Sequence, residues 1–348
     1  MMTGRLLTSL SLQAACLLLV PLAVAQNVRI VQTNSQSEVI SLIDPASQSV
    51  VAEITGIPVN HGAAAAPDGS RLYFSSEAKF TLDVVDGSSL QIIREIPLSG
   101  RPNNITIGKD GRHVYVGIMQ DPGGIDVIDT GRGGEKVRHI DTGSRVHNPY
   151  VTPDGKYLVA GTFGGSNNLV VYDIDTEQLA FALYPPRDDT DLEGVRPMAF
   201  ETNPDGSTRR MFVQLSDFHG FTVVDFARQQ EVSRILLPEL PESARDPGPY
   251  NRAPAHGIGV APDQRTLWVC SRMNGHVYAY SLPDLSYLGS VKVGSHPDWL
   301  TFSPDSRFVY VANGHSDDIS VVDIQGMSEV RRLKTGQAPK RNITVVLP

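Results

Sequence analysis

The segment "NGHSDD", residues 313–318, places one imidazole beside two carboxylates, in His315, Asp317 and Asp318. Histidine and carboxylate side chains are the groups that bind divalent metals and act as general acids and bases. The flanking runs "FVYVA" and "ISVVD" are β-branched and bounded by turn residues, which predicts two strands joined by this segment. Whether the segment is a site or an ordinary turn depends on whether the pattern recurs.

A turn signal does recur, at intervals of 42 to 58 residues. Pro-Asp-Gly and its variants have a central aspartate at six positions: Asp68, Asp110, Asp154, Asp205, Asp263 and Asp305. Proline presets φ, aspartate bonds the turn backbone, and glycine accepts positive φ. Each turn is followed by a β-rich run, a second run that mostly ends in Asp, and a third run. Four strands in a unit of about 42 residues are typical of a β-propeller blade.

The two ends of the chain supply a seventh unit. Residues 27–56 contain the second, third and fourth strands of a blade, and the C-terminal "QAPKRNITVVLP" reads as a first strand. Together they close the ring and leave no free sheet edge. The sequence therefore predicts an all-β fold, a seven-bladed β-propeller of four-stranded antiparallel blades. One C-terminal strand joins three N-terminal strands in the last blade.

The first 25 residues have the pattern of a secretory signal peptide. Arg5 precedes an apolar run from Leu6 to Val20, and Ala23-Val24-Ala25 matches a cleavage pattern. We expect cleavage after Ala25, a single propeller over residues 26–348, and a periplasmic or secreted location.

Composition limits the classes of partner. The net charge of the chain is −8, which argues against nucleic acid as a partner. No segment after residue 25 is long and apolar enough to span a membrane. Cys270 is the one cysteine of that part and is expected in the core. We expect a monomer whose partner is a small molecule or an extracytoplasmic protein.

The order of the repeat resembles the YVTN-type propeller repeat. That repeat consists of a strand, an Asn, an "xxIxVxD" strand, a further strand, Gly, Pro and the Pro-Asp-Gly turn, and residues 308–336 and 71–100 are its best copies here, each running as far as the Gly. The resemblance covers nearly the whole chain after residue 25 and implies a lactonase-like secreted propeller. Such propellers include lactonases, lyases, oxidoreductase subunits, surface-layer proteins and binding modules, so the resemblance indicates fold more than function.

Antiparallel alternation assigns each residue to one of two faces. The Pro-Asp-Gly turns lie on the face called the bottom here. The loops between second and third strands, and the links from fourth strands to the next first strands, lie on the top. Six third strands end in Asp at the bottom, and Ser281 takes that place in the remaining blade. We interpret these aspartates as turn caps, because a residue repeated around the ring does a local job.

Seven of the nine histidines map to the top face. One column at the mouth of the channel contains His61, Asn103, His147, Met198, His256, Asp298 and Asn342, one from each blade. His296 precedes Asp298 by two residues, and the other three top-face histidines lie in or beside the loops between second and third strands. Two links longer than the repeat requires, residues 181–197 and 236–256, lie on the same face.

We predict that any site lies in the top pocket under these two links. The candidate catalytic residues are His219, His256, Arg196 and Asp298. The candidate ligand-binding residues are His61, His147, His219, His256, His276, His296, His315, Tyr250 and Arg252. The one cofactor considered is a divalent metal ion, with His219, His256 and His296 as candidate ligands. The alternative is that these polar residues simply cap the inner strands around a wet channel.

Three functions are compatible with this pattern. The first is an extracytoplasmic binding or scaffold module that uses its His-rich top face. The second is a lactonase-like or lyase-like enzyme that uses the top-face histidines and carboxylates as general acids and bases. The third is an accessory protein for metal binding or electron transfer.

Overall fold

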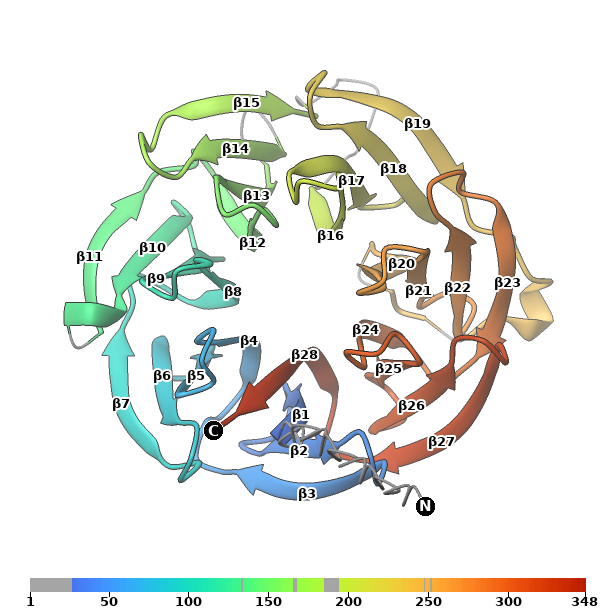
Figure 1. The fold of residues 1–348 in the computed structure, drawn as a ribbon, viewed down its shortest axis with the longest axis horizontal. Coiled ribbons are helices and arrows are strands. Elements are labelled where there is room, and N and C mark those ends of the chain that lie inside the picture. Colours follow the sequence, from blue (N-terminus) through green and yellow to red (C-terminus); the bar gives the residue numbers. More distant parts are fainter. Residues whose placement is uncertain (1–26, 133, 165–167, 185–193, 247, 251) are drawn as a thin grey trace, which may run out of the picture.

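The computed structural model describes residues 27–132, 134–164, 168–184, 194–246, 248–250 and 252–348. The predicted signal peptide lies outside them. Seven four-stranded antiparallel sheets stand around a central channel like blades (Figure 1). Within the described ranges, helix is limited to the short 3-10 turns η1 (Thr130–Arg132) and η2 (Glu242–Ala244). None of the helices in this part of the chain could cross a membrane.

Each blade runs from a first strand at the channel to a fourth strand at the rim (Figure 1). The first strands are β4 (Asn60–Ala65), β8 (Pro102–Ile107), β12 (Arg145–Val151), β16 (Val195–Thr202), β20 (Ala255–Val260), β24 (Pro297–Phe302) and β28 (Pro339–Leu347). The second strands are β5 (Arg71–Ser76), β9 (His113–Ile118), β13 (Tyr157–Phe163), β17 (Thr208–Leu215), β21 (Thr266–Ser271), β25 (Phe308–Asn313) and β1 (Asn27–Asn34). The third strands are β6 (Thr81–Asp86), β10 (Gly124–Asp129), β14 (Leu169–Asp173), β18 (Gly220–Asp225), β22 (His276–Ser281), β26 (Asp318–Asp323) and β2 (Ile40–Asp44). The fourth strands are β7 (Ile92–Pro97), β11 (Glu135–Ile140), β15 (Leu179–Leu183), β19 (Gln230–Leu236), β23 (Tyr287–Lys292), β27 (Ser328–Lys334) and β3 (Ser49–Ile54).

The ring closes as predicted, within the blade that contains both β28 and β1. These strands pair antiparallel from Asn27 opposite Leu347 to Gln32 opposite Asn342. The C-terminus therefore lies beside the first described residues (Figure 1). The seven-bladed fold and its closing strand are confirmed.

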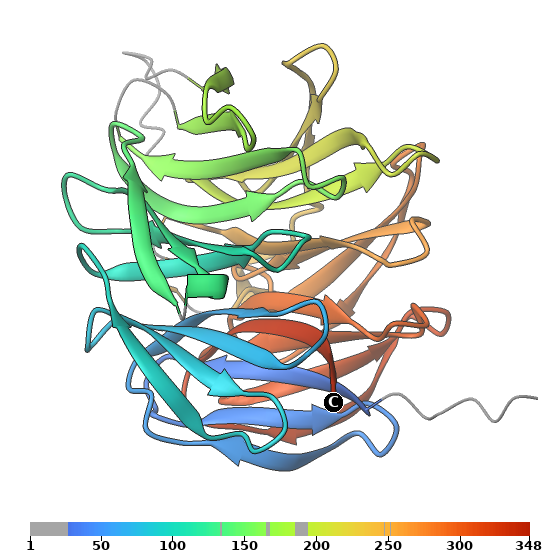
Figure 2. The ribbon, with the colours of Figure 1, turned by 60° about the vertical axis from the view of Figure 1, so that its left-hand side comes forward.

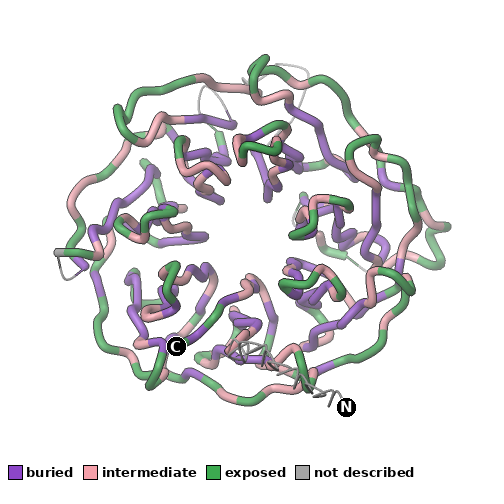
Figure 3. The backbone as a smooth tube through the Cα atoms, in the orientation of Figure 1, coloured by how far each residue is buried: buried purple, intermediate pink, exposed green. Residues whose placement is uncertain are grey.

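The core lies between neighbouring blades, whereas the rim strands are largely exposed (Figure 3). One apolar cluster joins β21 and β22 to β24 and β25, with Trp268 fully buried among its members. Cys270 lies in the same cluster, and burial raises the pKa of its thiol well above the ordinary value. Cys270 is thus a core residue, as the sequence predicts.

The aspartates that end the third strands hold turns at the bottom face. Asp86 Oδ1 accepts hydrogen bonds from the backbone N–H groups of Ser88 and Ser89, at 3.1 and 2.9 Å. Blade strands run between this face and the top face, where the other connections lie (Figure 2).

The carboxylates of the "NGHSDD" segment also have structural partners. Asp318 Oδ1 accepts from Asn313 Nδ2 and from Ser316 Oγ, each at 2.9 Å, and Asp317 Oδ1 accepts from the backbone N–H of Ala338 at 2.8 Å. The segment is therefore a turn whose two carboxylates are engaged in holding it.

Candidate active site

Every first strand is irregular near its top end. The pairing of first and second strands shifts register there in all seven blades, for example between Val146 and Asn148 in β12 and between Pro297 and Trp299 in β24. A β-bulge bends its strand and re-aims a side chain, and bulges are common beside active sites. Each of these irregular steps contains at least one polar or charged residue, and they include His61, Asn103, His147, Arg196, His256, Asp298, Lys340 and Arg341.

Three of these residues, His256, Asp298 and Lys340, form with Arg272 a group that we call the Asp298 cluster, in which Lys340 alone is partly exposed. His256 Nδ1 lies 2.8 Å from the Asp298 carbonyl oxygen and 3.2 Å from its Oδ1. Arg272 pairs with the same Oδ1, and Lys340 Nζ lies 2.5 Å from Oδ2. Since Nδ1 of His256 faces two acceptors, it carries the proton of the neutral ring and leaves Nε2 with its lone pair.

The charges of this cluster fix the protonation of its members. Burial raises the pKa of Asp298, but Arg272 and Lys340 outweigh it and hold that pKa well below the usual range. Burial, followed by the charge of Arg272, lowers the pKa of His256 well below its ordinary value. The cluster at neutral pH therefore contains two cations, one anion and a neutral imidazole, with one net positive charge.

A second group, the Glu77 cluster, contains His61, Glu77, Arg101 and Asn103. His61 Nδ1 lies 2.5 Å from Glu77 Oε1, and Arg101 approaches Glu77 Oε2 at 3.3 Å. Burial raises the pKa of Glu77, but the hydrogen bond from His61 and the nearby cations lower it overall, so the carboxylate is ionised at neutral pH. Thr33 Oγ1 donates to the carbonyl oxygens of His61 and Arg341, at 2.7 and 3.0 Å, so the top ends of β4 and β28 are neighbours and both clusters face one mouth.

His147 and Arg196 form a third side of the mouth. The ring of Phe163 stacks on His147 at 5.0 Å between centroids and carries the Arg196 guanidinium 4.5 Å from its centroid. The His147 ring meets His256 edge-on at 5.7 Å. Asn148 Nδ2 donates to His147 Nδ1, and burial lowers the pKa of His147 well below its ordinary value. His147 is thus neutral, with Nε2 as its donor.

The second long link packs against the Asp298 cluster. Asp246 accepts from Ser295 Oγ at 3.0 Å and from the backbone N–H of His296, and Tyr250 offers its carbonyl oxygen to Arg272 at 3.2 Å. The ring of His296 stacks on that of His315 at 3.9 Å between centroids. Burial lowers the pKa of His296 to about 3. The first long link lies largely outside the described residues, because 185–193 are not among them.

The remaining candidates have partners of their own on the top face. His219 Nε2 lies 2.7 Å from Ser271 Oγ, and burial lowers the pKa of His219 to about 4. His276 Nδ1 lies 2.6 Å from the Asn274 carbonyl oxygen, and Arg252 pairs with Asp217 at 2.6 Å. The charges that act on His219 are those of Glu239 and Arg245. The structure thus brings His61, His147, His256, Asp298 and Arg196 to the mouth, and it gives His219, His276 and Arg252 separate surroundings.

Sequence reasoning missed Glu77, Arg272, Lys340 and Arg341. Lys340 and Arg341 directly precede the column residue Asn342, so their place near the mouth could have been predicted from the column. Glu77 and Arg272 each directly follow a second strand, at the top of β5 and β21. The repeat shows that Glu77 and Arg272 occupy equivalent positions. It does not show that these positions lie beside the polar residues of the first strands, which depends on the folded structure.

The described residues contain no group of three or more His, Cys, Asp or Glu side chains placed to hold a metal ion. The carboxylate nearest to His256 is that of Asp298, and both of its oxygens face cations. A metal cation at this position would be repelled by Arg272 and Lys340. The donor set at Asp298 therefore favours an anionic or polar ligand over a metal ion.

Comparison with known proteins gives a family. The model of the family described as lactonase, 7-bladed β-propeller matches residues 125–346. A 6-phosphogluconolactonase of Enterobacter sp. (strain 638) is 22% identical over an alignment of 294 residues that covers 78% of this chain and 84% of that protein. Among solved structures, the periplasmic gluconolactonase of Pseudomonas aeruginosa is similar with a TM-score of 0.73 and 21% identity, over 92% of this chain and 100% of that one.

The same fold also occurs in a protein whose name does not describe a lactonase. Hydrazine synthase of Kuenenia stuttgartiensis is similar with a TM-score of 0.68 and 23% identity, over 82% of this chain and 89% of that one. Structural likeness at such identities establishes the fold alone. The family match covers more than half of the sequence and is the stronger finding. The chain belongs to the lactonase family of seven-bladed β-propellers.

Proposed function

We propose that the protein is a lactonase, which hydrolyses a cyclic ester at the top mouth of the channel. The observation that carries the proposal is the pairing of two unlike clusters at one mouth. The Glu77 cluster can hold an added proton, and the Asp298 cluster has a net positive charge. Ester hydrolysis needs both functions, a base that takes a proton from water and a positive group near the developing oxyanion.

His61 is the proposed general base. Its Nδ1 is directed at Glu77, so Nε2 is free to accept a proton from water. The imidazolium that forms is stabilised by the Glu77 carboxylate, as a carboxylate stabilises the histidine of a hydrolytic triad. His256 is a poorer base, because a proton on it would add a second net positive charge to the Asp298 cluster.

Lys340 is the proposed oxyanion partner. Its ammonium group has three donors, one of which is directed at Asp298, and its side chain is 24% exposed. The water oxygen attacks the lactone carbonyl carbon while His61 takes the water proton. The C=O electron pair moves to the oxygen beside Lys340. On collapse, the ring C–O bond breaks, the ring oxygen takes the proton from His61, and the hydroxy acid ionises to a carboxylate.

The names of two relatives, gluconolactonase and 6-phosphogluconolactonase, support a lactone as the substrate. The leader-like first 25 residues and the periplasmic name of one relative support an extracytoplasmic location. The YVTN repeat type, the monomeric state and the separate role as a binding module stay predictions. The assay below decides between enzyme and binding module.

The experiment is a pH-stat assay of purified protein on D-glucono-1,5-lactone, 6-phosphogluconolactone and γ-butyrolactone. We expect acid release above the uncatalysed rate on at least one lactone, and loss of that rate in His61→Ala. His113→Gln is the matched control, because His113 lies in β9 near the bottom face. Folded wild-type protein without activity on any lactone would contradict the proposal and favour the binding module.

A further inference from the structure

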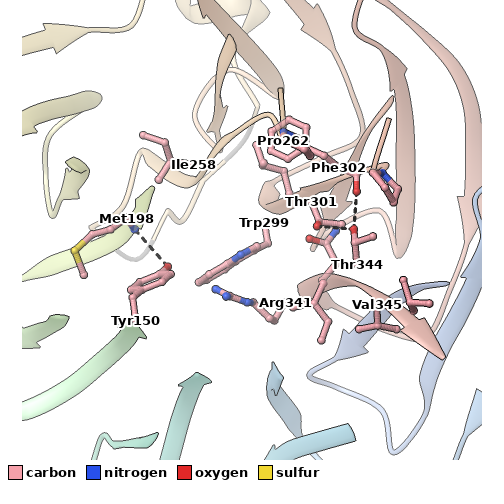
Figure 4. Close-up of a pocket in the computed structure, with 15 residues that line it drawn as sticks. Tyr150, Met198, Ile258, Pro262, Trp299, Thr301, Phe302, Arg341, Thr344 and Val345 are labelled. Carbon is pink, nitrogen blue, oxygen red and sulfur yellow. Dashed lines mark hydrogen bonds between the residues drawn. The ribbon is translucent and has the colours of Figure 1, made fainter. Parts of the chain in front are cut away.

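A cavity of about 590 Å³ occupies the channel below the mouth (Figure 4). It extends from Arg341 in β28 down to Pro262 and Pro304, in the bottom turns that follow β20 and β24. Its volume lies in the range of small-molecule sites, which is about 300–1,000 Å³. The cavity therefore has room for a ligand in addition to any group held at the mouth.

The walls of this cavity are mainly apolar, in contrast to the charged mouth above it. Tyr150, Met198, Ile258, Trp299 and Phe302 reach it from four different blades. Trp299 also touches the mouth, because its ring lies 5.3 Å from that of His256. The apolar cavity and the charged mouth therefore adjoin at Trp299.

Arg341 is the charged group at the top of the cavity. Its guanidinium lies 4.4 Å from the Trp299 ring centroid and 5.6 Å from that of Tyr150 (Figure 4). Its Nε is buried without a hydrogen-bond partner, and no carboxylate of the described residues pairs with the side chain. Two aromatic faces thus hold a planar cation in place, and its donors suit a carboxylate bidentately.

We propose that the channel binds an amphiphilic carboxylate, with the carboxylate on Arg341 and a medium-length alkyl chain in the cavity below. The identification of this ligand as the product of a lactone rests on the proposed function. The substrate is then a lactone that carries an alkyl substituent, and the amphiphile is the hydroxy fatty acid formed by its hydrolysis. A sugar lactone would leave the apolar walls of Met198, Ile258 and Phe302 in contact with hydroxyl groups or water.

The first test is calorimetric titration of the wild-type protein with butyrate, hexanoate, octanoate and decanoate. Burial of each methylene predicts binding about fourfold tighter per added CH₂ until the cavity is full. Arg341→Gln should weaken octanoate binding by about tenfold or more, since a hydrogen bond to a charged group is lost. Arg331→Gln, on the exposed rim strand β27, is the matched control and should leave binding unchanged.

An affinity that does not rise with chain length would overturn the inference, as would unchanged octanoate binding in Arg341→Gln. A parallel assay uses γ-lactones from γ-valerolactone to γ-decalactone, for which kcat/KM should rise with chain length. Tight octanoate binding without any lactone hydrolysis would support the site and contradict the proposed function. Hydrolysis of gluconolactone without octanoate binding would support the function and contradict the site.

Discussion

The Glu77 cluster and the Asp298 cluster contain the same pair, a histidine Nδ1 beside a carboxylate, in different surroundings. The His61 and Glu77 side chains are 13% and 14% exposed, whereas those of His256 and Asp298 are 4% and 0% exposed. Asp298 faces two close cations, and Glu77 pairs with one cation, Arg101, whose side chain is 46% exposed. The two pairs therefore differ in hydration and in net charge.

This difference explains how one residue pair can have two roles. In the wetter, balanced cluster, a proton added to His61 is compensated by Glu77 and solvent. In the more buried Asp298 cluster, the carboxylate of Asp298 already pairs with Arg272 and Lys340, and His256 stays neutral. A buried charge is costly without its partner. The Asp298 cluster should therefore keep a fixed net positive charge, and the Glu77 cluster should act as the proton acceptor.

The largest contrast is expected between Asp298→Asn and Glu77→Gln. Asp298→Asn leaves the buried Arg272 and the partly buried Lys340 without a carboxylate, which should lower the free energy of unfolding by about 3–5 kcal/mol. Glu77→Gln removes a charge-assisted pair that is partly hydrated, and its cost should be smaller, about 1.5–3 kcal/mol. Urea unfolding of both variants and the wild type measures these values.

A double variant checks the cause of the Asp298 effect. Asp298→Asn combined with Lys340→Met removes one of the unpaired cations and should recover part of the lost stability. Equal destabilisation in the two single variants would show that burial does not distinguish the clusters as we argue.

The next contrast concerns the base. His61→Ala should lower kcat on the best lactone by about 10²–10⁴-fold, which is the usual contribution of a general base. His256→Ala should affect stability more than kcat, because its proton acceptor role is opposed by Arg272 and Lys340. Steady-state kinetics and unfolding curves of both variants give the comparison, and the reverse order of kcat losses would assign the base to His256.

The repeat predicted nearly all of the fold, because each repeat contains the four strand patterns and the turn residues of one blade. Turn residues such as Asp86 bond to backbone groups two or three residues away, so their role can be predicted from the local sequence. Closure also followed from the sequence, because the ends of the chain carry complementary parts of one blade.

The candidate site follows from the sequence only in part. The column of His61, His147, His256 and Asp298 follows from the repeat register, and the structure places all four at the mouth. The bulges that aim these side chains, and the partners Arg272 and Lys340, depend on how neighbouring blades pack. Repeat position alone also could not separate His219, which bonds Ser271, from the histidines at the channel.

A smaller effect is expected on stability as the pH falls. Burial lowers the pKa of His256 in the folded protein, so below about pH 6.5 the unfolded chain takes up a proton that the folded chain does not. The free energy of unfolding should therefore decrease, by up to about 1.4 kcal/mol per pH unit for each such histidine. His296, with a folded pKa of about 3, adds a second contribution of the same sign.

Urea unfolding between pH 7 and pH 5 tests this dependence. His256→Asn should make the pH slope of wild-type stability shallower by about one proton, and the double variant with His296→Asn by about two. An unchanged slope in the double variant would mean that these rings are protonated in the folded state as well.

The smallest effect is expected from removal of metal ions. Both oxygens of Asp298 face cations, and the carboxylate of Glu77 is shared between His61 and Arg101, so a divalent ion at either cluster would have to displace a positive side chain. Dialysis against EDTA should therefore leave lactonase activity within about twofold of the untreated rate. Added Zn²⁺ should not increase that rate. A large loss on EDTA treatment that Zn²⁺ or Ca²⁺ restores would instead place a metal at the mouth, and would remove the oxyanion role from Lys340.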